Sequence, residues 1–285
     1  MADVQAPGKV RTVELDSQGT EPGPCNVRQL LRWGHPPPRC GAHLLINPPL
    51  RLSQLSQPPE SGRPPQLVRP GLWLFAPSRD SQGGSSWLLE AGAWGGRGDL
   101  LVDCPGFTQA NLDSLQRRTA EVGPGTIVLT SREGHGRCRR LQEALGWSVL
   151  VQEQEAYLLP GVRACTSFGA EHTLAPGVAL LWTPGPTPGA CVLHVHTGEL
   201  DGLFCGRLLV PTGPSALAPL PTARTFHWGR QLASVERLRA WLPAGSPAWI
   251  ASGAGLGALR GDKLVMGGAA LLAGLDLAPS ALPRG

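Results

Sequence analysis

Short apolar runs bounded by Gly and Pro fill the chain from about residue 68 onward. Apolar runs of about four to eight residues between turn signals are typical of buried strands. We expect strands within residues 71–75, 85–92, 99–106, 125–131, the beginning of 148–159, 178–182, 190–197, 202–210 and 249–253. These strands form two groups along the chain, one nearer the N-terminus and one nearer the C-terminus.

Three segments, residues 109–123, 138–147 and 230–242, carry the periodicity of amphipathic helices. The second stops at Gly146, a residue suited to a helix C-terminus. We also expect a last packed helix within residues 264–278, after a final strand at WIASG. Helices placed among two groups of strands predict a layered α/β fold, with functional loops at the strand ends.

The first 67 residues differ from the rest in their density of proline, as in GHPPPRC, INPPLRL and SGRPPQL. Because proline disrupts helix interiors and central strands, residues 1–67 predict a largely irregular N-terminal extension. One short helix is expected there, at Asn26–Trp33. Residues 68–285 then form the folded domain.

Charge and cysteine usage narrow the classes of function. The chain has a net charge of +4, and only Lys9 and Lys263 are lysines. No dense basic run with interleaved aromatic residues occurs, so the sequence does not favour a nucleic-acid partner. Seven cysteines without a CxxC pair indicate reduced thiols in the cytoplasm. We expect no membrane span, because the longest apolar stretch near the end is too short and contains Asp276.

Four loops, each following an apolar strand, carry a family resemblance: VLTSREGHG, TPGPTPGA, LFCGRLL and IASGAG. Their order and spacing resemble the metallo-β-lactamase fold, whose loops read THxHxDH, TPGHTPG, LFxGD and PGHG. The resemblance covers roughly residues 68–272 and implies an αββα four-layer sandwich. More narrowly, FAPSRDSQGG, VQEQEAYLLPG and TARTFHWGRQL resemble a cyanobacterial subfamily of unassigned function.

The resemblance implies seven positions that hold metal ligands in the family's hydrolases. In this sequence they are occupied by Ser131, Glu133, His135, Gly136, Pro186, Arg207 and Ala254. Of these, only Glu133 and His135 have side chains that could coordinate a metal, and neither is the family's residue at its position. An Arg cannot ligate, and beside a cation each unit of charge is repelled by about 4 kcal/mol. We therefore expect neither zinc nor iron at this site.

Two hypotheses follow for Arg207. In the first, its guanidinium replaces the metal by forming an ion pair with Glu133 on the facing loop; the alternative is that both side chains extend into solvent. In the second, Arg207 binds an anionic ligand in the old substrate cleft, together with Ser131 and with Arg132 or Arg137.

Other chemistry-bearing residues are weighed against structural roles. His194 and His196 share one strand face at a spacing that can bind metal, but we favour a solvated outer face. His227 precedes a helix, and we favour a capping role over a catalytic one. Cys138 and Cys205 are more typical of small core residues than of nucleophiles. GAGLGALRG has the wrong spacing for a phosphate-binding loop.

These observations favour a metallo-β-lactamase-fold pseudoenzyme, a non-catalytic cytoplasmic protein that binds a small anionic ligand or a protein partner. The alternative is a hydrolase with a remodelled site that uses Glu133, His135, Arg207 and His227. An RNA-processing relative is a third possibility, which the missing ligands and the mild positive charge disfavour.

Overall fold

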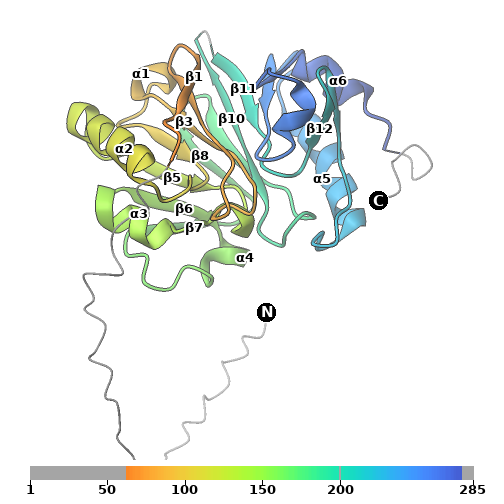
Figure 1. Ribbon diagram of the computed structural model, residues 1–285. Coiled ribbons are helices and arrows are strands. Elements are labelled where there is room, and N and C mark those ends of the chain that lie inside the picture. The colour runs from red at the N-terminus through yellow and green to blue at the C-terminus, as the bar shows by residue number, and fades with distance from the viewer. Residues whose placement is uncertain (1–61, 199, 278–285) are drawn as a thin grey trace, which may run out of the picture. The chain divides into compact units, whose positions relative to one another are not determined.

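The computed structural model describes residues 62–198 and 200–277 (Figure 1). The predicted extension falls almost wholly outside these residues, and so does the predicted helix Asn26–Trp33. The first strand, β1, occupies Gln66–Arg69 and so begins before the boundary expected at residue 68. No helix in the described ranges is long and apolar enough to cross a membrane.

Seven strands form the first sheet, in the order β1-β2-β3-β4-β5-β6-β7. Strands β1 to β4 pair antiparallel, and β4 to β7 pair parallel. Parallel neighbours need a crossover connection, and α2 (Gln109–Val122) and α3 (Cys138–Leu145) provide two of them on the outer face. The strands span Gln66–Arg69, Leu72–Phe75, Ser86–Leu89, Leu100–Val102, Thr126–Leu129, Ser148–Gln152 and Cys165–Phe168.

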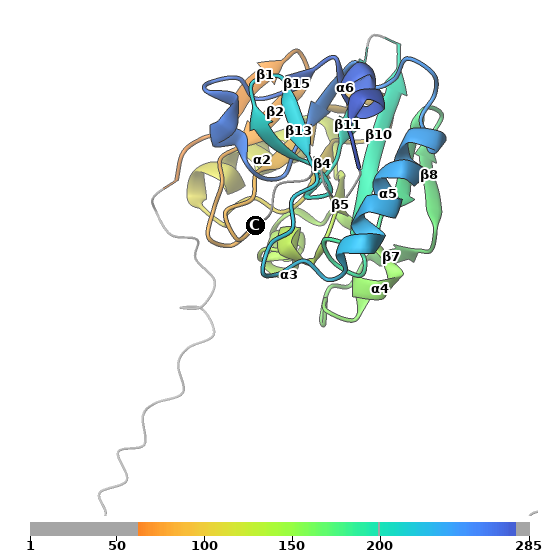
Figure 2. The ribbon, with the colours of Figure 1, turned by 90° about the vertical axis from the view of Figure 1, so that its right-hand side faces the viewer.

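Six strands form the second sheet, in the order β15-β14-β11-β10-β9-β8. Helices α5 (Trp228–Trp241) and α6 (Gly268–Gly274) pack on its outer face, and Figure 2 shows α5 in front of these strands. A separate hairpin joins β12 (Val210–Gly213) to β13 (Ala216–Ala218). From β8 to β15 the strands of the sheet are Glu171–Ala175, Val178–Trp182, Cys191–Thr197, Leu200–Phe204, Trp249–Ala251 and Val265–Met266.

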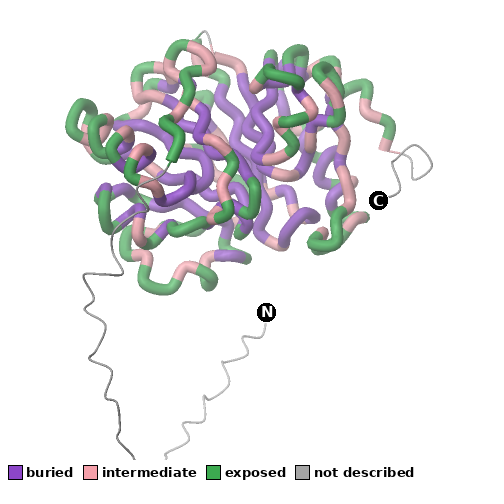
Figure 3. The backbone as a smooth tube through the Cα atoms, in the orientation of Figure 1, coloured by how far each residue is buried: buried purple, intermediate pink, exposed green. Residues whose placement is uncertain are grey.

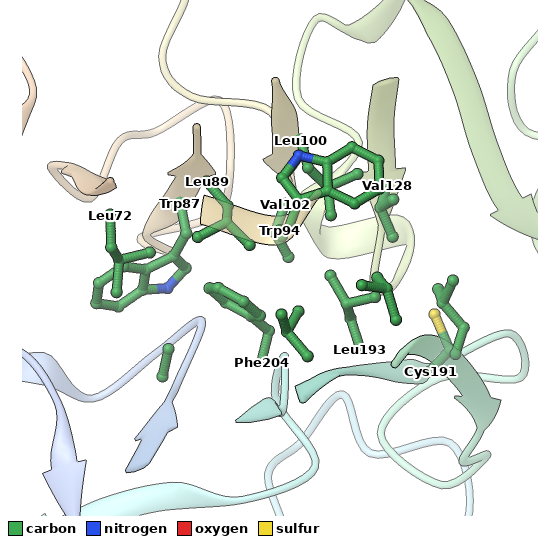
Figure 4. Close-up of a cluster of buried hydrophobic side chains, with 14 of the residues drawn as sticks. Leu72, Trp87, Leu89, Trp94, Leu100, Val102, Val128, Cys191, Leu193 and Phe204 are labelled. Carbon is green, nitrogen blue, oxygen red and sulfur yellow. The ribbon is translucent and has the colours of Figure 1, made fainter. Parts of the chain in front are cut away.

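The two sheets pack face to face around the main hydrophobic core. Trp87 of β3 contacts Phe204 of β11 with ring centroids 6.3 Å apart, and Phe204 contacts Trp249 of β14 at 5.5 Å. Figure 4 shows side chains from both sheets entering this layer, and Figure 3 shows the buried positions concentrated in the interior of the domain. Burial of apolar surface stabilises a fold by about 25 cal/mol per Å². Large aromatic side chains therefore contribute the most stabilising free energy per residue in this layer. The order helix, sheet, sheet, helix confirms the predicted αββα sandwich.

Local chemistry sets the helix ends. The Thr108 side chain accepts a hydrogen bond from the Asn111 backbone N–H at the start of α2. Gly146 adopts a left-handed φ of 71° at the end of α3, as the sequence predicts. The short helices α1 (Ala91–Trp94) and α4 (Glu153–Ala156) complete the first half of the domain.

One predicted element is wrong in its extent. Residues 264–278 do not form a single helix, and WIASG is not the last strand. Gly267 has a left-handed φ of 71° and so ends the two-residue strand β15 before α6 begins. The apolar run continues through this break, and for that reason the hydrophobic pattern alone does not reveal it.

Candidate functional site

The loops that carry the family resemblance meet at one end of the two sheets. Backbone hydrogen bonds join them, because Cys191 N donates to Thr130 O at 2.8 Å and Gly253 N donates to Gly206 O at 2.7 Å. The segment 78–85 closes this end, where Ser85 N donates to Gly253 O at 2.9 Å. The side chains between these loops therefore share one small volume.

An ion pair between Arg207 and Glu133 occupies the centre of this volume. Arg207 Nε lies 2.9 Å from Glu133 Oε2, and the two side chains are 23% and 11% exposed. The same guanidinium donates from Nη2 to the carbonyl oxygens of Ser81, at 3.1 Å, and Gln82, at 3.0 Å. A largely buried Arg needs such partners, since an unpaired charge there would lose its hydration without compensation. The structure therefore contains the ion pair of the first hypothesis.

Asp103, at the end of β4, supports the loop that carries Glu133. Its carboxylate is buried and accepts hydrogen bonds from Thr130 N at 2.7 Å and Thr130 Oγ1 at 2.6 Å. Burial raises the pKa of Asp103 to about 6, although these hydrogen bonds and the Arg207 charge oppose the rise. A side chain at Gly134 would meet Asp103 Oδ1 at 2.1 Å, so the glycine permits this close approach. We did not predict this role, although an Asp directly after the apolar residues LLV, in LLVDCPG, indicates a functional position at a strand end.

A second buried carboxylate, that of Glu155 in α4, joins two of the loops. Glu155 Oε2 accepts a short hydrogen bond from Arg132 N, and Glu155 Oε1 accepts one from Gly189 N at 3.1 Å. The side chain of Arg132 faces the same carboxylate, with Nε 4.0 Å from Oε1. Arg137 pairs with Asp80 at 3.1 Å. Both arginines considered as companions of Arg207 thus have other acidic partners.

A cavity of about 340 Å³ opens directly beside the ion pair. Four of the seven ligand positions border it, namely Glu133, Pro186, Arg207 and Ala254. Its opposite wall is the segment 220–225, which brings Arg224 Nη1 to 4.0 Å from Glu133 Oε1. Ser131 borders a small adjoining void of about 10 Å³ instead. We did not predict a role for Arg224, because its loop is distant in sequence from Glu133 and reaches the site only through the fold.

No protein-family model and no curated protein matches the chain by sequence, whereas many solved structures match by fold. A metallo-β-lactamase from Staphylococcus aureus subsp. aureus COL is 16% identical, with a TM-score of 0.53 over 75% of this chain and 67% of that chain. The chain has the metallo-β-lactamase fold. BLEG-1 B3 metallo-β-lactamase matches at 16% identity with a TM-score of 0.47, over 70% of this chain and 95% of that chain. The di-iron-bound form of TTHA1623 matches at 22% identity with a TM-score of 0.48, over 66% and 91%. At these identities the comparisons establish the fold alone.

The metallo-β-lactamase fold implies a metal centre in these loops, and the residues present do not fit one. Among residues 62–198 and 200–277, three His, Cys, Asp or Glu ligand atoms come within 4.8 Å of one another only at His194, His196 and Asp201. None of these three borders the cavity beside Arg207. At Gly136 the backbone has a φ of 48°, and a Cβ would lie 3.1 Å from Cys104 Cβ. A histidine at that position would be strained.

His135 and His227 lie outside this cavity. His135 is buried and borders a separate hollow of about 370 Å³ between α3 and residues 158–162. Burial, aided by the nearby Arg132 charge, lowers the pKa of His135 to about 4. His227 Nδ1 accepts a hydrogen bond from Arg230 N at 3.1 Å and caps α5, as the capping interpretation predicts. Of the four candidate catalytic residues, the structure brings only Glu133 and Arg207 together around the cavity.

The two cysteines near the loops are core residues. Cys138 and Cys205 are both buried, and burial raises the pKa of Cys205 to about 12. A thiol with so high a pKa stays protonated at neutral pH and is a poor nucleophile. The five cysteines of the described ranges are free.

The expectation that His194 and His196 lie on a solvated outer face is wrong for His194 and holds for His196. His194 is buried because α5 covers this face of the sheet, and its ring lies 6.0 Å from that of Trp241. Burial lowers the pKa of His194. His196 stays exposed further along β10. The period of two along the strand correctly predicts that His194 and His196 share a face. A helix distant in sequence determines which of the two is exposed to solvent.

Proposed function

We propose that this protein is a non-catalytic member of the metallo-β-lactamase superfamily that binds a small anion in the cavity beside Arg207. The observation that carries the proposal is the Arg207–Glu133 ion pair at 2.9 Å, at positions where the family's hydrolases hold metal ligands. A fixed arginine supplies positive charge without coordination chemistry. The protein would therefore retain the family's attraction for anionic groups and lose its means of activating water.

The charges around the cavity favour an anionic ligand. Arg207 and Arg224 contribute two positive charges and Glu133 one negative charge, which leaves one net positive charge. Arg224 Nη1 donates a short hydrogen bond to Gln82 Oε1, but the side chain is 67% exposed, so its other N–H groups can reach a ligand. Thr222 and Thr225 border the same cavity, and their hydroxyls can donate to carboxylate or phosphate oxygens. In this proposal Arg224 is the second arginine that binds the anion, a role for which the sequence suggested Arg132 or Arg137.

Thermal denaturation in the presence of inorganic phosphate, sulfate and small dicarboxylates tests this binding. Because sulfate and phosphate also stabilise proteins non-specifically, the comparison between variants decides the result. We expect at least one anion to raise the Tm of the wild-type protein and of Arg139→Ala, an exposed arginine on α3, but not that of Arg224→Ala. Equal shifts in all three proteins, or no shift with any anion, would contradict the proposal.

Three finer predictions belong to the same proposal. The cytoplasmic location rests on seven cysteines without a CxxC pair, and the narrower likeness to a cyanobacterial subfamily rests on three sequence segments. Two of those segments contact the site, because Gln82 accepts a hydrogen bond from Arg207 and Arg224 approaches Glu133.

A protein partner bound over the cavity is compatible with the same charges. Co-purification from the native host with a partner that Arg224→Ala no longer retains would support it.

A further inference from the structure

The β10–β11 hairpin presents a second cluster of chemistry-bearing side chains, away from the cavity. His196 and Asp201 are directly opposite each other across the two strands, and His194 lies two residues back on the same face. At the other end of β10, Cys191 bonds to the loop of the first site. Five steps of about 3.3 Å along β10 lead from Cys191 to His196, so the cluster lies roughly 16 Å along the strand from the contact with that loop.

The distances in this cluster are compatible with a shared metal ion. His194 Nε2 and His196 Nδ1 both lie 3.3 Å from the same oxygen, Asp201 Oδ1. That separation is longer than the usual N–H···O bond of about 2.9–3.0 Å. Two ligand atoms about 2.1 Å from a tetrahedral zinc ion are separated by roughly 3.4 Å, which follows from the tetrahedral angle and the bond lengths. The three ligand atoms lie within 4.8 Å of one another.

The surroundings hold this arrangement in place. Asp201 Oδ2 accepts a hydrogen bond from Ala248 N at 2.9 Å, which fixes the carboxylate and leaves Oδ1 facing the two rings. Ser246 Oγ lies 2.7 Å from His194 Nε2 and also donates a short hydrogen bond to Asp201 Oδ1. Within the described part of the chain, Asp201 contacts the two imidazoles and forms no ion pair with a Lys or Arg. No resident cation of the protein therefore competes for this carboxylate.

We infer that His194, His196 and Asp201 form a binding site for a divalent transition-metal ion, with zinc as the best match. Two imidazoles and one carboxylate are ligands of borderline softness, which suit zinc and do not suit magnesium or calcium. The His196 side chain is 58% exposed, so water or the Ser246 hydroxyl can complete a four-coordinate site. The ion would fasten the hairpin to the segment that carries Ser246. None of these residues belongs to the seven ligand positions of the family resemblance.

Calorimetric titration of metal-free protein with zinc tests the site, with cobalt absorption as a report on tetrahedral geometry. His196→Ala is the informative variant, because this exposed side chain contributes little to the core. His172→Ala, on β8 of the same sheet, is the matched control. We expect stoichiometric zinc binding by the wild type and by His172→Ala, and at least tenfold weaker binding by His196→Ala.

Two results would overturn the inference. One is that the wild-type protein binds no zinc, and the other is that His196→Ala binds it as tightly as the wild type. Unchanged circular dichroism and Tm of metal-free His196→Ala would show that a loss of affinity is not a loss of fold. Asp201→Asn provides a second reading, because it keeps the hydrogen bond from Ala248 N but removes the charge that the ion requires.

Discussion

The ion pair between Arg207 and Glu133 lies at the centre of the loop cluster. At a position where the resemblance places an aspartate ligand, a guanidinium reverses the charge, and Glu133 lies close enough to neutralise it. Three hydrogen-bond acceptors surround Arg207: the Glu133 carboxylate and the carbonyl oxygens of Ser81 and Gln82. The pair therefore stabilises the loops as well as filling the site.

A double-mutant cycle measures this coupling. Arg207→Gln and Glu133→Gln each remove the close partner of a partly buried charge, so we expect each to lower the free energy of unfolding by about 2 kcal/mol. The coupling energy should be about 1–2 kcal/mol in urea denaturation. The control pair Arg139–Glu143 has the same 2.9 Å separation but is 62% and 52% exposed, and should couple by only about 0.3–0.5 kcal/mol. Equal coupling energies for the two pairs would contradict the account.

Asp103 and His135 should give opposite pH dependences to stability. Folded Asp103 keeps its proton up to about pH 6, whereas its pKa is 3.8 without burial, so this group destabilises the fold as pH rises across that window. The pKa of His135 falls from 6.5 to about 4, so unfolding takes up a proton there and the group stabilises the fold as pH rises. Each effect amounts to about 3 kcal/mol.

Single variants separate the two effects. Between pH 4 and about 6, Asp103→Asn should gain unfolding free energy relative to the wild type as pH rises, and His135→Gln should lose it. Urea denaturation at several pH values provides the measurement. Parallel curves for the wild type and both variants would show that neither group titrates as described.

At the scale of secondary-structure elements, local sequence patterns predict the strands with apolar runs and the amphipathic helices. Strands β2 to β6, β9 to β11 and β14 coincide with apolar runs, and α2, α3 and α5 with amphipathic periods. Strands β1, β7, β8, β12, β13 and β15 were not predicted, since each is short and has at most one buried residue. Local patterns also miss contacts between distant segments, and so could not reveal Arg224 near Glu133 or α5 above His194.

The start of α5 offers a direct test of helix capping by His227. Because His227 Nδ1 accepts the Arg230 N–H, His227→Ala should lower the free energy of unfolding by about 1 kcal/mol. His227→Asp keeps an acceptor at the cap and should remain within a few tenths of a kcal/mol of the wild type. If both variants lose the same stability in urea denaturation, capping is not the role of this side chain.

At the scale of the whole domain, the second sheet serves two sites from opposite ends of β10. The end at Cys191 is hydrogen-bonded to Thr130, next to the loop that carries Glu133, and the end at His196 carries the inferred zinc ligands. Metal bound to the wild-type protein would therefore not reveal which site holds it. The His196→Ala variant removes this ambiguity, because it disables the hairpin site and leaves the cavity unchanged.

The metal content of His196→Ala after incubation with zinc, iron and manganese, followed by dialysis, tests the central claim most directly. We predict no stoichiometric metal, because four of the seven ligand positions are occupied by an arginine, a proline, a glycine and an alanine that cannot coordinate it. One or two equivalents of metal retained by this variant would show that the cavity still holds a metal centre, and would contradict the replacement of that centre by the Arg207–Glu133 pair.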